Sequence, residues 1–526
     1  MRGLSVEGAE GVVPYGQRPC RVVVLGGGLS GLTAAYRLSR SGSEGQPPPE
    51  VVLLEARERV GGAIWTDRED GFTFEGGADS FITDKPDALE LCLELGLELI
   101  PTQDRHRRSF VVHRGRLEPV PEGFVLMAPK RLAPLLTSPI LSWRGKLRLL
   151  MEPFVPCRSS EELQDESLAS FVKRRLGREA LERLVQPLVA GIYTADPNEL
   201  SLKATLPRFL EMERSQGGLI RAARRQERAA RAKARTRPDP SAPDPAGAGA
   251  RYGMFVTPAQ GMASLVEALV GALPPGTLRL RTPVRRIVRT PMATTPAPSS
   301  PRDQSSETND PTRPWRVELL DGPAIEADAV VLAVEAHAAA RLVDGLDSEL
   351  ARLLRSIPYA SSAILNLSFR RDQIAHPLNG FGAVVAAREN RDLLAVSFTS
   401  VKFPHRAPKD HVLMRAFFGG ATRPDLFDHD DEALRQLALS ELSGLLGIQG
   451  EPIHAKVARH ARAMPQYILG HLDRVEAIEQ RVKAIPGLVL AGNALRGVGV
   501  PDCVRSATRA AQAVVQRLGL TRTHGA

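Results

Sequence analysis

A glycine-rich turn near the start of the chain has the spacing of a phosphate-binding loop. The pattern G-x-G-x-x-G is satisfied by Gly26, Gly27, Gly28, Leu29, Ser30 and Gly31. In such a turn the first glycine allows the tight bend, the second lets the backbone approach a pyrophosphate, and the third lets the following helix pack closely on the strand. The helix N-terminus then offers free N–H groups and the positive end of its dipole to the phosphates.

An acidic residue follows at about the distance that dinucleotide-binding folds use. Glu55 lies 24 residues beyond Gly31, where about 20 are expected, and the excess fits the polar, proline-rich stretch between them. Its carboxylate would accept hydrogen bonds from a ribose. A ligand-free strand–turn–helix and an ordinary surface glutamate are the alternatives. The turn, the spacing and the flanking apolar stretches together favour a bound dinucleotide.

Two further glycine motifs have the same character. The pattern E-x-x-x-R-x-G-G covers 55–62, and the sequence Gly-Gly-Ala-Asp-Ser follows at 76–80. Near the C-terminus, the apolar stretch 487–491 leads through glycines at 492, 497 and 499 to a helix expected at roughly 502–517. A second helix N-terminus would thus follow a glycine-rich turn, which is again a suitable place for a ligand.

The elements that position these motifs can be predicted from apolar patterning. Short β-branched stretches predict buried parallel strands at 20–26, 50–55, 328–334 and 487–491, and a helix is expected at 29–40. The β–α–β order indicates an α/β fold. Further strands are expected at 363–369, 393–400 and 411–418, and helical periodicity covers 86–100 and about 140–190.

Composition excludes several classes of protein. The chain has 526 residues, 43% of them hydrophobic and 25% charged, which is typical of a soluble globular protein. The net charge is +9, but eight basic residues fall within 221–237, so the basicity belongs to one insert and does not indicate nucleic-acid binding. Four cysteines without CxxC spacing predict neither a disulfide scaffold nor a zinc site. We expect the inserts 221–250 and 290–314 to be disordered, with an exposed basic helix or a membrane-surface contact as the alternatives for the first.

The motifs together resemble those of known flavoproteins. G-x-G-x-x-G followed by E-x-x-x-R-x-G-G is similar to FAD-dependent amine-oxidase-type flavoproteins and not to NAD dehydrogenases. Longer segments are more specific, namely 70–80, 186–201 (QPLVAGIYTADPNELS), 255–261, 464–473 (MPQYILGHLD) and 486–502. These segments resemble the bacterial, oxygen-dependent protoporphyrinogen oxidases, and the resemblance runs from about residue 20 to 519.

The resemblance implies a multi-lobed chain of the α/β (α+β) class. A Rossmann-like FAD-binding domain would be assembled from the discontinuous segments 19–85, 253–338 and 481–519. A β-sheet substrate domain would comprise 86–105, 195–252 and 339–480, and a helical lobe that approaches a membrane would comprise 106–194. Residues 1–18 and 520–526 are expected to form a loose leader and a tail.

The resemblance also implies site residues. Besides 26–31, contacts to FAD are expected from Glu55, Ala56, Arg59, Gly62, Ala63, Gly77, Ala78, Asp79, Ser80, Val284, Ala491, Gly492, Val498, Gly499 and Val500. Substrate contacts are expected from Trp65, Ala336, Leu353 and Phe369, with Arg496 as a candidate cation for a propionate. No catalytic acid–base residue and no metal site is assigned, because the flavin carries the chemistry.

The implied reaction is the six-electron oxidation of protoporphyrinogen IX to protoporphyrin IX by FAD and dioxygen, with release of hydrogen peroxide, in haem biosynthesis. Oxidation of coproporphyrinogen III is the alternative. Trp65 stands where mitochondrial-type relatives place an arginine, and its bulk mildly favours the substrate with fewer carboxylates. An amine oxidase, a carotenoid desaturase and a flavin-free binding module are more distant possibilities. Expected protein partners are a ferrochelatase and a second copy of the chain. The enzyme is expected in the cytoplasm, in peripheral contact with the inner face of the cell membrane.

Overall fold

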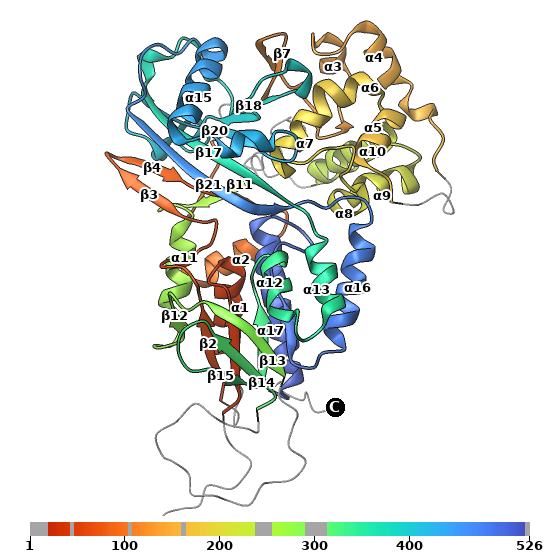
Figure 1. Ribbon diagram of the computed structural model, residues 1–526. Coiled ribbons are helices and arrows are strands. Elements are labelled where there is room, and N and C mark those ends of the chain that lie inside the picture. The colour runs from red at the N-terminus through yellow and green to blue at the C-terminus, as the bar shows by residue number, and fades with distance from the viewer. Residues whose placement is uncertain are drawn as a thin grey trace, which may run out of the picture.

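The computed structural model describes residues 19–42, 47–103, 108–158, 165–236, 255–289 and 313–520, except for the side chains of 230–231 and 233–236. Figure 1 shows a lower lobe around a parallel sheet and an upper half in which a second sheet and a group of helices lie side by side. The expected leader 1–18, most of the tail, and most of the second insert lie outside the described residues.

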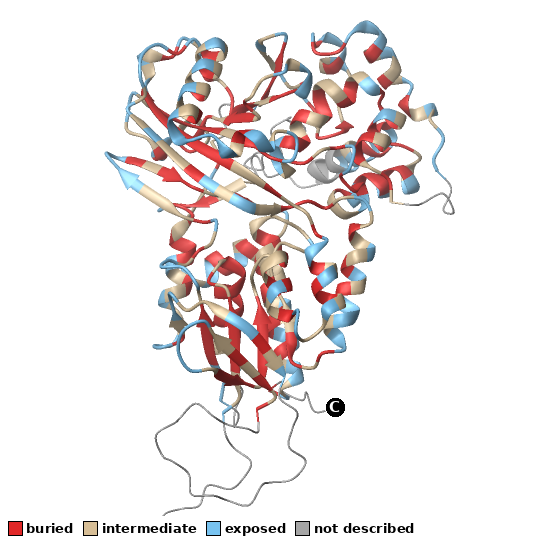
Figure 2. Ribbon diagram, viewed as in Figure 1, coloured by how far each residue is buried: buried red, intermediate tan, exposed pale blue. Residues whose placement is uncertain are grey.

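The lower lobe is built on a five-stranded parallel sheet. Its order is β12 (Leu278–Arg279), β2 (Glu50–Leu54), β1 (Arg21–Leu25), β16 (Ala329–Leu332) and β22 (Leu488–Leu490). The central strands are apolar because both faces are covered, so the red of buried residues fills this sheet in Figure 2. This arrangement confirms the α/β fold that the β–α–β pattern predicted.

Each face of the sheet packs against its own layer. One face is covered by α1 (Leu29–Ser39), α2 (Asp87–Glu94), α11 (Ala263–Gly271) and α17 (Val500–Arg517). The other face is covered by α12 (Ala336–Val343), α13 (Ser348–Arg355), α16 (His471–Lys483) and a small sheet of β13 (Val284–Arg289), β14 (Trp315–Leu319) and β15 (Ile325–Ala327).

A seven-stranded mixed sheet dominates the upper half. Its order is β21 (His454–Pro465), β17 (Tyr359–Arg370), β20 (His411–Gly419), β19 (Ala395–Ser397), β18 (Gly382–Val385), β7 (Phe110–His113) and β8 (Arg116–Pro119). Helix α15 (Asp431–Leu446) packs on one face. The hairpin of β3 (Thr66–Glu69) and β4 (Phe72–Glu75) and the sheet of β5 (Phe81–Ile82), β11 (Phe255–Pro258) and β6 (Leu99–Pro101) connect it to the lower lobe.

A helical lobe with its own apolar core completes the upper half. It contains α3 (Ala133–Thr137), α4 (Trp143–Leu150), the short helix η1 (Glu152–Phe154), α5 (Leu168–Arg175), α6 (Arg178–Ala180), a π-helical turn (Leu181–Val185), α7 (Gln186–Tyr193), α8 (Leu202–Thr205), α9 (Pro207–Gln216) and α10 (Leu219–Thr236). None of the helices within the described ranges is long and apolar enough to cross a bilayer.

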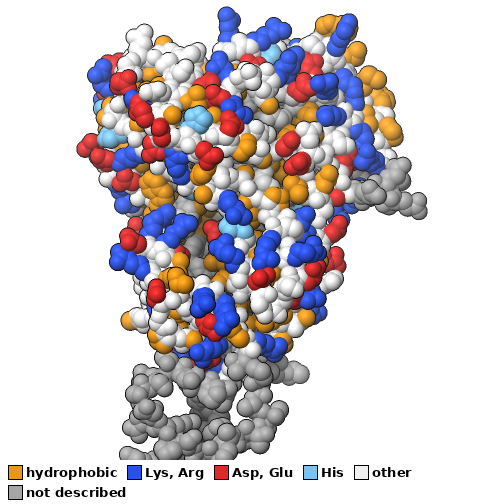
Figure 3. Space-filling model, in the orientation of Figure 1, with side chains coloured by type: hydrophobic (Ala, Val, Ile, Leu, Met, Phe, Trp, Pro, Cys, Tyr) orange, Lys and Arg blue, Asp and Glu red, His pale blue; other side chains and the backbone are white. Residues whose placement is uncertain are grey.

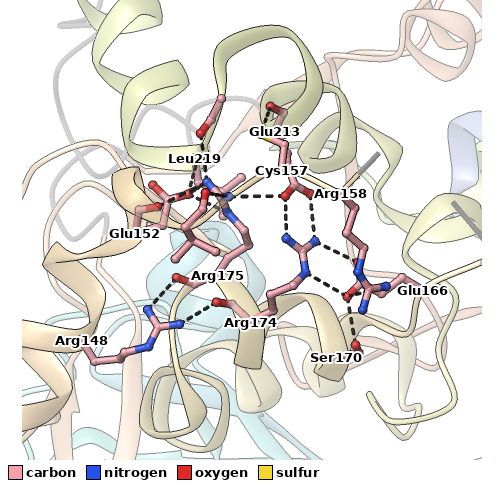
Figure 4. Close-up of polar contacts among 12 residues, drawn as sticks. Arg148, Glu152, Cys157, Arg158, Glu166, Ser170, Arg174, Arg175, Glu213 and Leu219 are labelled. Carbon is pink, nitrogen blue, oxygen red and sulfur yellow. Dashed lines mark hydrogen bonds and ion pairs between the residues drawn. The ribbon is translucent and has the colours of Figure 1, made fainter. Parts of the chain in front are cut away.

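Buried ion pairs tie the helices of this lobe together (Figure 4). Arg175 and Glu152 are both fully buried, and Nε of Arg175 donates to Oε1 of Glu152 over 2.9 Å. The same carboxylate accepts hydrogen bonds from the N–H groups of Leu219 and Ile220, at 2.8 and 3.0 Å, and so caps the N-terminus of α10. Arg174 pairs with Glu213 on α9 at 2.6 Å, which links α5 to α9.

Several expected boundaries differ from the structure. Helix α2, which was expected in the substrate domain, packs on the parallel sheet. Three further helices, α12, α13 and α16, also pack on this sheet, although they lie wholly or mostly within 339–480, a segment expected in the substrate domain. The stretch 106–194 is not purely helical, because 110–119 contributes two strands to the large sheet. The helical lobe also continues beyond 194, since α8, α9 and α10 share its core. The strand expected at 393–400 is shorter, and α14 (Thr399–Lys402) begins there.

The first insert is also different from the expectation of disorder. Residues 221–236 belong to helix α10, and the buried Ala222 and Ala223 pack in the core of the lobe. The helical alternative therefore describes this part better, although one face of the helix is packed and not exposed. Residues 237–250 lie outside the described residues, as do 290–312 of the second insert.

Candidate functional site

The predicted phosphate-binding turn has an open side. Gly26 has a φ of +103°, and a Cβ on Gly31 would lie 1.8 Å from the carbonyl oxygen of Gly26, so the bend and the close helix contact both require glycine. A Cβ on Gly28, in contrast, would meet no atom within 4 Å. Gly28 is the N-cap of α1, and no side chain caps that helix end. The first N–H groups of α1 are therefore available to an anion.

Glu55 lies beside this turn at the end of β2. Its Oε2 accepts a hydrogen bond from the Gly27 N–H at 2.6 Å, and its Oε1 accepts one from the Arg57 N–H at 2.8 Å. Thr282 N–H donates to the Glu55 carbonyl at 2.9 Å, which brings the half-buried Val284, two residues further on, to the same region. Ala56 is exposed next to Glu55.

The second glycine motif packs directly on the first. The Gly61 N–H donates to the Gly27 carbonyl at 2.8 Å, and Arg59 Nη2 donates to the Gly62 carbonyl at 2.8 Å. The exposed Ala63 follows, and a Cβ on Gly77 would lie 2.0 Å from its carbonyl oxygen. The segments around 26–31, 59–63 and 77 thus lie together beside the start of α1.

Asp79 forms a charged cluster with two cations of the upper half, Lys402 on α14 and Arg415 on β20. Lys402 Nζ lies 2.9 Å from Asp79 Oδ2, and Arg415 Nη1 lies 3.3 Å from it. Burial opposes ionisation of Asp79, but the charges of Lys402 and Arg415 outweigh it and hold the pKa of Asp79 well below its usual range. The cluster joins the loop Gly77–Ser80 to the sheet and leaves one net positive charge there.

The C-terminal glycine motif forms the second helix N-terminus. Gly499 is the N-cap of α17, and its N–H donates to Asp502 Oδ2 at 3.2 Å. Lys85 Nζ pairs with Asp502 at 2.7 Å and so connects the loop after β5 to this helix. The buried Ala491 precedes Gly492, where a Cβ would meet no atom within 4 Å.

A large cavity of about 1,620 Å³ opens where the three lobes meet. It is lined by Ala78, Asp79 and Ser80 from one side and by Val498, Gly499 and Val500 from another. The upper sheet contributes Ala395, Val396 and Phe417, and the helical lobe contributes Leu188, Ile192, Tyr193 and Leu206. The cavity therefore connects two predicted cofactor segments with apolar walls from both upper lobes.

The residues predicted to contact a substrate are not brought together. Ala336 is buried in the core beneath the parallel sheet, Leu353 packs against that core, and Phe369 is buried in the core of the upper sheet. Trp65 packs its ring over Gly76, and none of these four residues lines the large cavity. Arg496 does line it, but its guanidinium pairs with Glu479 at 2.7 Å.

Two residues that sequence reasoning left aside position the cavity wall. Tyr467 OH donates to the Asn493 carbonyl at 2.6 Å, and His471 stacks on its ring at 3.9 Å between centroids. Burial lowers the pKa of His471 to about 4, so the neutral imidazole donates from Nε2 to the Leu495 carbonyl at 2.9 Å. Both lie in the MPQYILGHLD segment, which carried family resemblance but showed no role by itself.

One group of potential metal ligands occurs within the described ranges, away from the cavity. Glu69, Asp70 and His454 hold their ligand atoms within 4.8 Å of one another, on the β3–β4 hairpin and on β21. Lys456 forms an ion pair with Glu69 there, and this ammonium already supplies a positive charge.

Comparison with known proteins identifies the group to which these features belong. The family described as flavin-containing amine oxidoreductase matches residues 29–515. The chain belongs to this family. The chain is an oxidoreductase, and FAD is its cofactor. The residues fit FAD, because the space beside Gly28 and the uncapped start of α1 can accept a pyrophosphate, and Glu55 lies at the turn.

Individual relatives are similar over nearly the whole chain. The coproporphyrinogen III oxidase of Bacillus subtilis is 31% identical over 486 residues, which cover 92% of this chain and 95% of that protein. The protoporphyrinogen oxidase 2 of Arabidopsis thaliana is 28% identical, with 95% and 94% covered. A solved structure from Exiguobacterium sp. 255-15, provisionally described as a protoporphyrinogen oxidase, has a TM-score of 0.78 at 30% identity and covers 96% of this chain and 100% of that one.

Proposed function

We propose that this flavoenzyme oxidises a porphyrinogen to the corresponding porphyrin in haem biosynthesis, with FAD as the hydride acceptor and dioxygen as the final oxidant. Six hydrogens leave the macrocycle in three cycles, and each cycle reduces one dioxygen to hydrogen peroxide. The observation that carries the proposal is the similarity over more than nine-tenths of the chain to relatives named for this reaction.

The cavity is consistent with such a substrate. Its volume of about 1,620 Å³ exceeds the roughly 300–1,000 Å³ typical of sites for a single small ligand, so it has room for a flavin ring and a broad macrocycle. Bound FAD would supply the redox chemistry by accepting the hydride. The apolar side chains of both upper lobes would exclude water and orient the macrocycle, while the N-terminus of α17 offers its positive dipole end to the cavity wall.

Of the two porphyrinogens, the comparisons favour coproporphyrinogen III. Three bacterial relatives with that name are 30–32% identical to this chain, whereas the plant relatives named protoporphyrinogen oxidase are 26–29% identical. The bulk of Trp65 favoured the substrate with fewer carboxylates, but Trp65 does not line the cavity. Protoporphyrinogen IX is the second candidate, because those plant relatives match 92–95% of this chain.

An aerobic fluorescence assay tests both substrates. Purified, FAD-loaded protein is given coproporphyrinogen III or protoporphyrinogen IX, with heat-inactivated protein as the control for autoxidation. We expect faster formation of coproporphyrin III, with one hydrogen peroxide released for each two electrons removed. Faster formation of protoporphyrin IX would transfer the proposal to the second candidate. Absence of turnover on both substrates by protein with bound flavin would contradict the proposal.

We also propose that the helical lobe contacts a membrane surface. Trp143 and Leu147 lie one turn apart on α4, and Met151 caps its C-terminal end, with Phe154 just beyond. Their exposed fractions are 69%, 53%, 51% and 81%. In Figure 3 hydrophobic side chains gather at the outer edge of this lobe among basic ones. Apolar side chains on a helix flanked by basic residues are typical of interfacial attachment.

Sedimentation with vesicles tests this contact. Replacing both Trp143 and Phe154 by serine is expected to weaken binding to phosphatidylglycerol-containing vesicles by at least about tenfold, because each large apolar side chain contributes about 1.5–3 kcal/mol on burial. Leu93, 61% exposed on α2 of the lower lobe, provides the matched control as Leu93→Ser. Equal binding by the double variant, the control and the unmodified protein would refute the contact.

A further inference from the structure

The cationic side chains that line the cavity differ in whether a carboxylate of the chain already pairs with them. Within the described residues, eight cationic side chains line the cavity, namely Lys85, Arg108, Lys203, Arg208, Lys402, Arg415, Arg496 and Arg505. Most of them are paired with acids of the chain itself. Lys85 pairs with Asp502, Lys402 and Arg415 pair with Asp79, Arg496 pairs with Glu479, and Arg505 pairs with Asp87.

Two of these cations have no such acid. Neither Lys203 nor Arg108 lies within ion-pair distance of a carboxylate in the described part of the chain, and both side chains are exposed. Arg208 is different, because its guanidinium lies 4.7 Å from the centre of the Phe209 ring. We therefore propose that Lys203 and Arg108 bind the carboxylates of the substrate at the cavity wall, an inference that rests on the proposed porphyrinogen oxidase function.

The backbone around Lys203 is held firmly while its ammonium is left free. Leu202 is fully buried in the core of the helical lobe, and the Ser201 hydroxyl accepts a hydrogen bond from the Ala204 N–H at 3.0 Å as the N-cap of α8. Tyr193 OH donates to the Thr205 carbonyl at 3.1 Å on the other side. A free ammonium on a fixed backbone offers a carboxylate a partner whose position is partly preorganised.

Arg108 comes from the other upper lobe. It directly precedes the stretch that leads into β7 of the large sheet, and its carbonyl accepts a hydrogen bond from the Phe381 N–H at 2.8 Å. Lys203 and Arg108 therefore belong to two different walls of one cavity. A macrocycle with carboxylate arms in that cavity could be held from both sides, with the arginine suited to a two-pronged contact and the lysine to a single one.

Arg496, the cation that the sequence suggested for a propionate, is less suited to this role. Arg496 donates twice to Glu479, at 2.8 and 2.7 Å, so its guanidinium is already engaged by a carboxylate. A substrate carboxylate would have to displace Glu479 to use it. Lys203 and Arg108 require no such exchange.

The test uses full-length, FAD-loaded protein with the substitutions Lys203→Met and Arg108→Met. Binding of the product coproporphyrin III is compared with binding of its tetramethyl ester by porphyrin fluorescence, and KM and kcat are measured with coproporphyrinogen III. We expect each variant to bind the free acid about tenfold more weakly and to have a KM about tenfold higher, because hydrogen bonds to charged groups are among the stronger ones. Ester binding, kcat and the flavin spectrum should be unchanged. Lys203→Arg and Arg108→Lys, which keep the charge, should restore most of the affinity.

The control is Lys173→Met, an exposed lysine of the same lobe outside the cavity. Unmodified protein that binds the free acid no better than the ester would overturn the inference, as would variants that bind the free acid as tightly as unmodified protein. Failure of the proposed function looks different, since turnover of both porphyrinogens would then be absent. If neither porphyrinogen were turned over, weaker binding of the free acid by Lys203→Met and Arg108→Met, but not by Lys173→Met, would still support the carboxylate site.

Discussion

Replacing Gly28 by valine is expected to give folded protein without FAD. The backbone of Gly28 is extended, with φ −72° and ψ 176°, and a Cβ there meets no protein atom within 4 Å, so the chain itself can accept the side chain. The space that the side chain would fill lies at the open start of α1, where the pyrophosphate is expected. Loss of two hydrogen bonds to phosphate, at about 1.5–3 kcal/mol each, would weaken FAD binding by roughly 10²–10⁴-fold.

The measurement is the flavin absorbance of the purified protein relative to its concentration, together with circular dichroism to confirm the fold. Gly444→Val is a matched control, because Gly444 lies exposed in α15 and a Cβ there also meets no atom within 4 Å. Gly31→Val would be less informative, since its side chain would collide with the Gly26 carbonyl and disturb the fold directly. A Gly28→Val protein that retains stoichiometric flavin would contradict the assigned pyrophosphate position.

The strand, glycine turn and helix at 20–31 could be predicted because their signal is local. A buried strand, a glycine turn and a helix N-terminus are adjacent in sequence, so the pattern at 20–31 determines its own geometry. The order of the parallel strands could not be predicted in the same way. Strand β12 pairs with β2, and β22 pairs with β16, over long sequence separations that no local pattern records.

The large cavity could not be predicted from the sequence for a related reason. Ala336 and Phe369 are apolar and follow strand patterns, and such residues fill a core as readily as they line a slot. The structure places both of them in cores. The residues that do line the cavity, such as Lys203 and Tyr467, come from separate lobes and meet only in the folded chain.

The basic insert shows how composition can conceal a helix with a buried face. The Ala/Arg content of 221–237 suggested a solvated segment, but Leu219, Ile220, Ala222 and Ala223 repeat at helical spacing and are buried. The arginines at 221, 224, 225 and 228 are exposed, either between these residues or in the turns that follow them. Small alanines carry a weak hydrophobic signal, so the apolar face was easily missed.

Replacing the buried Arg175 by methionine is expected to destabilise the helical lobe strongly. Arg175 is fully buried and donates to Glu152, to the Val155 carbonyl at 2.8 Å and to the Gly217 carbonyl at 3.2 Å. Without it, the fully buried carboxylate of Glu152 would keep only the two N–H groups at the start of α10. Removing one partner of a buried ion pair costs about 3–5 kcal/mol, because the other charge stays buried without compensation.

Hydrogen exchange in α5 and α10 measures this loss as a lower free energy of opening, and retained flavin content would confirm that the lower lobe is intact. Arg178→Met, three residues away, is the matched control, because Arg178 is 82% exposed in its pair with Glu182 and exposed pairs contribute little. The double variant Arg175→Met, Glu152→Gln should recover part of the stability, since the neutral amide oxygen can still cap α10 while the buried charge is gone. Equal protection in the Arg175→Met and Arg178→Met proteins would mean that the helical lobe does not depend on this ion pair, and its stability would then rest on apolar packing alone.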